Sequence, residues 1–167
     1  MTARSRSSPP ASAAEPDTPA ELRARALRLL ARREHSRAEL ARKLGPHADS
    51  PQALVPLLDA LEAKKQLSDE RYAEERARQL SRKYGAARIR QDLRARGVED
   101  ETAERMAAAA REGDLARARE ILRRKYRASA ETGEERARRA RFLQGRGFSH
   151  DVIRYALGGA CAETENQ

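Results

Sequence analysis

The residues of this sequence best suited to chemistry are its arginines, which crowd three segments. Two of these segments have few acidic neighbours in the sequence, and their basic residues are Arg88, Arg90, Arg94 and Arg96 in 86–96, and Arg136, Arg138, Arg139 and Arg141 in 134–146. A guanidinium binds phosphate or carboxylate in a bidentate geometry, so these segments fit contact with a polyanion or an acidic protein surface. The alternative is a solvated face without a partner. A third segment, 117–127, has more acidic neighbours, and we interpret most of it as a solvated face.

Catalytic chemistry finds no support in the remaining polar residues. His35, His47 and His150 lie far apart, without a Cys or carboxylate partner at metal-ligand spacing, and we expect His35 and His150 to be solvated at helix starts. Cys161 lies in a polar segment, and the phosphate-binding pattern G-x-x-x-x-G-K-[ST] does not occur. We therefore expect a protein that is not an enzyme and that uses neither a metal nor a cofactor.

The composition points to a basic, helical protein with several small cores. The 167 residues carry a net charge of +9, with 30 Arg against 5 Lys, which indicates a polyanionic or acidic partner, although a GC-rich coding bias would also favour Arg. The chain contains 33 Ala but only 17 Leu, and 6 Val and Ile together, so a sheet protein is nearly excluded. With one Cys, no secretory signal and no long apolar run, the cytoplasm is the expected location.

Helix start and stop signals divide the chain into nine expected helices. Capping boxes begin at Thr18, Ser36 and Thr132, and glycines such as Gly97 and Gly147 follow helix ends. The expected helices are 19–34, 37–44, 51–64, 69–83, 86–96, 100–111, 114–127, 134–146 and 150–158. Pro56 would break a hydrogen bond inside the third, which therefore kinks or begins later.

The nine helices repeat in threes with a period of about 48 residues. Leu44, Leu93 and Leu143 are 49 and 50 residues apart, and the latter two begin the shared pattern L-x-x-x-G-[apolar]. The sequence thus predicts an all-α, elongated solenoid of three tandem three-helix repeats, each with one small core supported by its neighbours. The expected organisation is a disordered N-terminal tail at 1–18, repeats at 19–66, 67–112 and 113–158, and a C-terminal tail at 159–167.

Four segments in this order resemble the RecX family of RecA regulators. Leu67-Ser-Asp69-Glu-Arg71-Tyr72-Ala73 is similar to the family's L-[DNS]-D-x-R-[YF]-A motif. The other three are Ser36-Arg-Ala-Glu-Leu-Ala-Arg-Lys-Leu44, the segment from Gly85 to Val98, and Gly147-Phe-Ser-His-Asp-Val-Ile-Arg-Tyr-Ala-Leu157. The chain departs from the family's pattern at Lys65, where a Gly is usual. A left-handed helix stop on Lys65 would cost about 1 kcal/mol, so we expect a different or longer turn there.

The resemblance implies a function, and the basic segments together with the Leu67–Ala73 motif supply candidate contacts. It implies a protein that binds the RecA filament, meets single-stranded DNA directly or through RecA, and inhibits ATP hydrolysis and strand exchange in DNA repair and the SOS response. Because the three repeats differ and show no dimer seam, we expect a monomer. Candidate contacts are Asp69, Arg71, Tyr72, Arg88, Arg90, Arg94, Arg96, Arg138, Arg139 and Arg141. Two alternatives stay open: Asp69 and Arg71 form a structural salt bridge, and Tyr72 and Tyr155 pack in the cores rather than stack on bases. The rival function is a sequence-specific, helix-turn-helix-like DNA-binding regulator.

Overall fold

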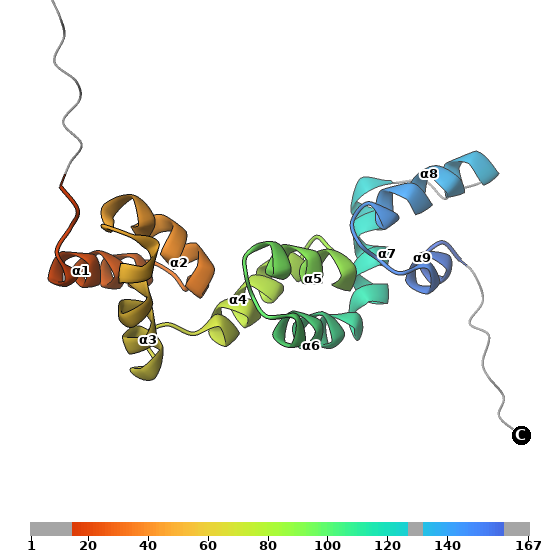
Figure 1. Ribbon diagram of the computed structural model, residues 1–167. Helices are drawn as coiled ribbons and strands as arrows, with labels where there is room; N and C mark the ends of the chain where they lie inside the picture. The colour runs from red at the N-terminus through yellow and green to blue at the C-terminus, as the bar shows by residue number, and fades with distance from the viewer. Residues whose placement is uncertain (1–14, 127–131, 159–167) are drawn as a thin grey trace, which may run out of the picture.

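The computed structural model describes residues 15–126 and 132–158 as helices arranged in an elongated molecule (Figure 1). These helices are α1 (Pro19–Leu30), α2 (Arg37–Leu44), α3 (Val55–Ala63), α4 (Asp69–Ser81), α5 (Ala86–Ala95), α6 (Asp100–Arg111), α7 (Asp114–Lys125), α8 (Gly133–Gln144) and α9 (His150–Ala156). Two short 3-10 turns, Gly45–His47 and Pro51–Leu54, connect α2 to α3. No strand occurs in the described ranges, and the predicted all-α, elongated solenoid of three-helix units is confirmed. Most of the two predicted tails, and Cys161, lie outside the described residues.

Two of the three predicted capping boxes form completely. At the start of α1, Glu21 N–H donates to the Thr18 hydroxyl, and Thr18 N–H donates to the Glu21 carboxylate. Thr132 and Glu135 do the same for α8. The box predicted at Ser36 is only half formed: the Ser36 hydroxyl accepts from Glu39 N–H, but the Glu39 carboxylate accepts from Arg33 at 3.0 Å instead. A charge-assisted bond to a guanidinium is stronger than one to a neutral backbone amide, and it turns Glu39 away from the cap.

Pro56 determines where the third helix begins. The helix was expected from residue 51, yet residues Pro51–Leu54 form a 3-10 turn and α3 starts at Val55. Pro56 therefore lies in the first turn of α3, where its missing N–H leaves no helical hydrogen bond unmade. Of the two outcomes that the sequence allowed, the late start is the one the structure adopts.

Left-handed turns follow α5, α8 and α3. Gly97 and Gly147 have φ of +79° and +81°, and the next residue donates back to Leu93 or Leu143, as in a Schellman motif. Lys65 takes the same conformation after α3, with φ of +55°, so the different or longer turn that its side chain led us to expect does not form. A side chain in this conformation is unfavourable, which makes Lys65 a strained stop.

Three separate apolar clusters form the cores of the three units. The first is centred on Leu40, Leu44 and Leu61, the second on Ile89 and Leu93, and the third on Leu143 with α7 and α9. Leu93 and Leu143 are both fully buried, as their shared place in the repeat predicted. Leu67 packs into the first cluster although it follows α3. The exact residue at which one repeat ends and the next begins stays a prediction.

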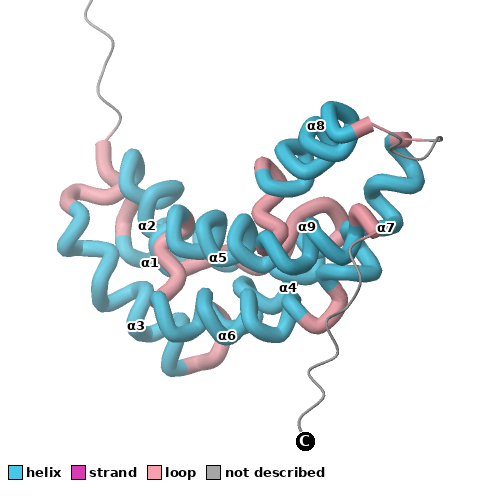
Figure 2. Tube along the Cα trace, turned by 90° about the vertical axis from the view of Figure 1, so that its right-hand side faces the viewer, coloured by secondary structure: helices cyan, strands magenta, loops and turns pink. Residues whose placement is uncertain are grey.

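Hydrogen bonds join the neighbouring units at both ends of α5, whose place in the molecule is seen in Figure 2. At its N-terminus, Gly85 N–H donates to the Arg146 carbonyl at 2.9 Å and Ala87 N–H donates to the Gly147 carbonyl at 3.2 Å. At its C-terminus, the Ser36 hydroxyl donates to the Arg96 carbonyl at 2.7 Å. The middle unit is therefore attached to the turn before α9 on one side and to the start of α2 on the other.

Two side-chain expectations are wrong. His35 is buried rather than solvated, because the turn between α1 and α2 packs it with Nδ1 3.0 Å from the Arg33 carbonyl, and this burial lowers its pKa. Tyr72 does pack in the second core, but Tyr155 is only half-buried and lies outside the third apolar cluster of the described residues. Its hydroxyl instead accepts from Arg154 at 3.0 Å, which keeps that edge of the ring near solvent.

Candidate functional site

The motif at the start of α4 connects the first two units. The Asp69 carboxylate accepts from Arg37 N–H at 2.6 Å, and Arg71 Nε pairs with Glu34 at 2.8 Å. The salt bridge between Asp69 and Arg71 that the sequence left open does not form, because each finds a partner in the first unit. Burial raises the pKa of Asp69, and the backbone donor Arg37 N–H opposes that rise.

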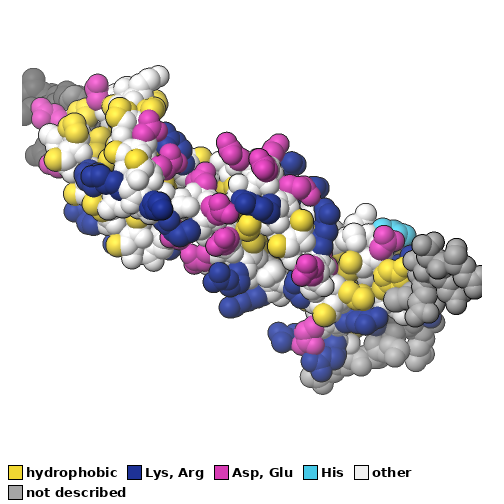
Figure 3. Space-filling view, turned by 90° about the horizontal axis from the view of Figure 1, so that it is seen from below, with side chains coloured by type: hydrophobic (Ala, Val, Ile, Leu, Met, Phe, Trp, Pro, Cys, Tyr) yellow, Lys and Arg dark blue, Asp and Glu magenta, His cyan; other side chains and the backbone are white. Residues whose placement is uncertain are grey.

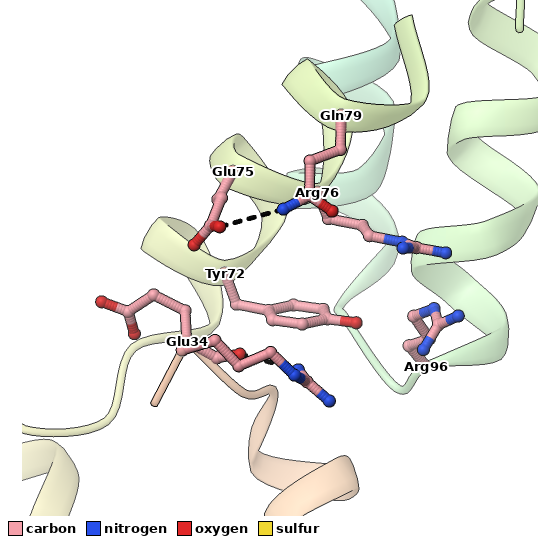
Figure 4. A pocket seen from close by; sticks show the side chains of 7 residues that line it. Glu34, Tyr72, Glu75, Arg76, Gln79 and Arg96 are labelled. Carbon is pink, nitrogen blue, oxygen red and sulfur yellow. Dashed lines mark hydrogen bonds between the residues drawn. The ribbon is translucent and has the colours of Figure 1, made fainter. Parts of the chain in front are cut away.

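A cavity of about 280 Å³ lies beside this motif, at the junction of the first two units. It is lined by Arg33, Glu34, Tyr72, Glu75, Arg76, Gln79 and Arg96. Tyr72 projects from α4 across the cavity, with its hydroxyl directed toward Arg96 on α5 (Figure 4). The tyrosine is 4% exposed, and burial raises the pKa of its hydroxyl despite the opposing charge of Arg96.

The charges around this cavity balance one another. Arg33 pairs with Glu39. Arg76 and Arg96 both pair with the Asp92 carboxylate, and the Nε of each arginine lies 2.8 Å from its Oδ2. Burial alone would raise the pKa of Asp92, but its hydrogen bonds to the two guanidiniums hold that pKa below its ordinary value. Because each of these guanidiniums already has a carboxylate, the cavity suits a joint between units better than an open anion site.

The four predicted arginines of α5 are not equivalent. Arg96 belongs to the joint described above, Arg90 pairs with Glu104 at 2.8 Å, and Arg94 pairs with Asp100 at 2.8 Å. Arg88 is exposed and hydrogen-bonds Gln91 at 3.0 Å. The smaller number of acidic neighbours within this segment did not reveal these pairs, because the next helix, α6, supplies both carboxylates. Acidic and basic side chains are interspersed over the middle of the face in Figure 3.

The predicted arginines of α8 lie on a helix that packs against α9 and near the end of α7. Arg138 and Arg141 are exposed, whereas Arg139 is half-buried over the Tyr126 ring, 4.6 Å from its centroid. Arg138 also approaches that ring, at 5.9 Å. The structure thus separates the predicted contacts into two groups, one at the joint of the first two units with the nearby α5 helix, and one on α8.

A basic and aromatic surface that the sequence did not predict lies next to α8. A groove of about 400 Å³ is lined by Arg82, Lys83, Ile121, Arg124, Lys125, Phe142 and Arg146. Its residues come from the end of α4, from α7 and from α8, so no local pattern in the sequence brings them together. The nearest signal in the sequence is the run Arg123, Arg124 and Lys125, whose interpretation as a solvated face left it out of the candidate contacts.

Neither a metal-binding cluster nor a membrane-spanning helix occurs in the described parts of the chain. In residues 15–126 and 132–158, no three or more His, Cys, Asp or Glu side chains gather where they could hold a metal ion. Among these residues, no helix is both long and apolar enough to cross a membrane.

Comparison with known structures gives the fold. A crystal structure of RecX from Lactobacillus salivarius superposes with a TM-score of 0.69 at 21% identity, covering 83% of this chain and 93% of that one. A second crystal structure, described as regulatory protein RecX, gives a TM-score of 0.71 at 24% identity, covering 82% of this chain and 71% of that one. At these identities the agreement concerns the arrangement of helices alone.

Comparison with known sequences gives the family. The profiles of the first, second and third three-helix domains of RecX match residues 23–46, 68–106 and 112–157. The chain is 45% identical to regulatory protein RecX of Leptothrix cholodnii, over 81% of this chain and 87% of that protein. It is 42% identical to regulatory protein RecX of Herbaspirillum seropedicae, over 90% and 98%. With its three domains in order and relatives matched along most of their length, this chain belongs to the RecX family of regulatory proteins.

Proposed function

We propose that the protein binds the RecA–single-stranded DNA filament in the cytoplasm and inhibits its ATP hydrolysis and strand exchange, acting as a regulator and not as an enzyme. The observation that carries this proposal is the end-to-end arrangement of three small units in a chain of this regulatory family. An elongated monomer can touch several subunits of a filament at once. Each further contact then forms within an existing complex, which raises the overall affinity.

The candidate contacts take different parts in this proposal. Arg88, Arg138 and Arg141 are exposed and would meet acidic groups of the filament directly, with Arg139 beside them on α8. Arg90 and Arg94 would do so only by exchanging their present carboxylate partners. Asp69, Arg71, Tyr72 and Arg96 would act indirectly, since they hold the first unit against the second.

The test is the ATPase of purified RecA on single-stranded DNA, measured with increasing amounts of this protein. We expect inhibition that weakens as salt rises, because exposed charge contacts are screened beyond about 8–10 Å at physiological ionic strength. No inhibition at any ratio would refute the proposal. We further expect R138E/R141E to inhibit less than the wild type, while R28E/R32E, a matched change on exposed arginines of the first unit, retains more inhibition.

The arrangement of the arginines on α5 does not support the rival function, in which a helix-turn-helix-like unit recognises a specific DNA sequence. A recognition helix needs long polar side chains that are free to reach base edges. On α5, three of the four arginines are instead bound to carboxylates of the same chain.

A further inference from the structure

The positive charge of this chain is distributed unevenly along its length. Residues 67–112 carry 11 Lys and Arg against 10 Asp and Glu, so the middle of the chain is almost neutral. Residues 113–158 carry 12 Lys and Arg against 6 Asp and Glu. Residues 19–66 carry 10 Lys and Arg against 6 Asp and Glu, and residues 159–167 carry two Glu without a Lys or Arg, so the positive excess lies at both ends of the chain and not in its middle.

Part of the positive excess at the end that holds α7 and α8 lies in the groove beside α8. Among the described residues that line it, five are cationic (Arg82, Lys83, Arg124, Lys125 and Arg146) and none is acidic. Arg124 of the lining pairs with Glu120, which Arg123 also contacts, at 2.6 Å each, so one negative charge serves two guanidiniums. Arg82, Lys83 and Lys125 are exposed. In contrast to the cavity beside Tyr72, this groove has cations left over.

One aromatic ring, Phe142, lines the groove, and the rings of Tyr84 and Tyr126 lie next to its cations. Lys125 Nζ lies 4.1 Å from the Phe142 ring centroid, and the Arg146 guanidinium lies 4.4 Å from the same ring. Arg146 also approaches the Tyr84 ring at 5.8 Å, and Lys125 approaches the Tyr126 ring at 5.8 Å. Phe142 and Tyr126 meet edge to face, with centroids 6.0 Å apart. All three rings are half-buried, so part of each is accessible.

We propose that this groove binds single-stranded DNA directly, with its cations on the phosphates and its rings beneath the bases. Phosphate contact requires positive charge that is not already neutralised, and the lining supplies it. Stacking requires aromatic surface interleaved with that charge, which an acidic protein would not use and which a paired duplex cannot fully exploit. Lys125 is exposed, so its ammonium can leave the Phe142 ring for a phosphate and open that face to a base. The inference deepens the proposed function, because it names the part of the chain that holds the DNA of the filament.

The test is binding of a fluorescent oligothymidylate to the full chain without RecA, followed by anisotropy over a range of salt concentrations. The variant R82Q/K83Q/K125Q removes three exposed charges and keeps a polar, uncharged side chain at each position. If each charge meets one phosphate, affinity should fall about 100-fold at 0.1 M salt, and the slope of log affinity against log salt should flatten by about 2. The matched control, R28Q/R32Q/R42Q, removes three exposed arginines from the first unit and should bind within about threefold of the wild type.

A second variant isolates the aromatic contribution. F142L keeps apolar volume next to the third core but removes the stacking surface. It should weaken oligothymidylate binding about tenfold and leave the salt slope unchanged, because no charge is lost. Circular dichroism of each variant checks that helix content is retained.

Each alternative outcome refutes the inference in a recognisable way. Equal losses in the two triple variants would show that net charge, and not the groove, attracts the DNA. Tighter binding of a duplex with the same number of phosphates, or equal competition by oligoglutamate, would show that the rings take no part. If the wild type inhibits the RecA ATPase but does not bind oligothymidylate, the inference fails while the proposed function stands. If it binds the oligonucleotide through the groove but does not inhibit RecA, the reverse holds.

Discussion

Replacing Gly147 by Ala should break the junction between the second and third units. Gly147 has φ of +81°, so a side chain there costs about 1 kcal/mol for the left-handed backbone. The added Cβ would also lie 2.5 Å from the Arg88 backbone nitrogen and 3.0 Å from its Cα. These atoms belong to the first turn of α5 and cannot rotate away, so overpacking should add about 1–3 kcal/mol. The total is a loss of about 2–4 kcal/mol in the free energy of unfolding.

Gly158 provides the control for this substitution. Its φ is +94°, but a Cβ on Gly158 meets no atom of the residues that the structure describes within 4 Å, so G158A carries the backbone cost without the clash. We expect G158A to lose about 1 kcal/mol at most. Urea unfolding followed by far-ultraviolet circular dichroism measures both, and solution X-ray scattering shows whether G147A changes the particle length. If the two variants lose the same stability and G147A keeps the wild-type scattering curve, the tight junction at Gly147 does not exist.

The remaining predictions concern single residues of the cores and joints, each measured by urea unfolding. L93A and L143A should each lose about 2–5 kcal/mol, because both leucines are fully buried in small cores; wild-type stability in both would contradict the repeat alignment. K65G should gain about 1 kcal/mol, because Gly relieves the left-handed backbone at φ of +55°, and a loss would mean that the Lys65 side chain contributes a contact. The pKa of Asp92 in the folded state lies below its ordinary value of 3.8. The ionised carboxylate therefore adds to the free energy of unfolding above that pH, and this contribution is lost as the pH falls through the folded-state pKa. In D92N this part of the acid dependence should disappear, and an unchanged acid profile would argue against the shared pair with Arg76 and Arg96.

The helices and their ends could be predicted from the sequence because the signals that set them are local. Thr18 and Thr132 cap their own helices, Pro56 excludes a continuous helix from residue 51, and Gly97 and Gly147 take the left-handed turns that the repeat pattern assigns to them. Each of these effects depends on residues within one or two turns. The prediction at Ser36 went wrong where this locality ends, since Glu39 found a partner outside its own helix.

The candidate site was less predictable because its interactions cross between elements. Arg90 and Arg94 have no acidic neighbour on their own face of α5, and only the packing of α6 brings Glu104 and Asp100 to them. In the groove, by contrast, the fold brings cations together. Lys125 lies at the end of α7, whereas Lys83 and Arg146 lie just after α4 and α8, and these positions are about 20 residues or more apart in the sequence. Composition reveals that the chain has a positive excess, but not which cations the fold neutralises and which it leaves unpaired.

The nature of the joints explains how a chain with such small cores can hold its charged ends apart. Ordinary surface salt bridges contribute little and shift with salt, and long side chains would let neighbouring units swing. Here α5 is instead attached through backbone atoms at its N-terminus and through the short Ser36 hydroxyl at its C-terminus. At this second end a Cβ on Gly97 would lie 2.4 Å from the Cβ of Ala38, so the first unit also packs directly against the turn that ends α5. Short connections fix the distance between the first unit and the basic groove. A fixed spacing favours a repetitive partner whose sites match it, because little conformational entropy is then lost when the second site is occupied.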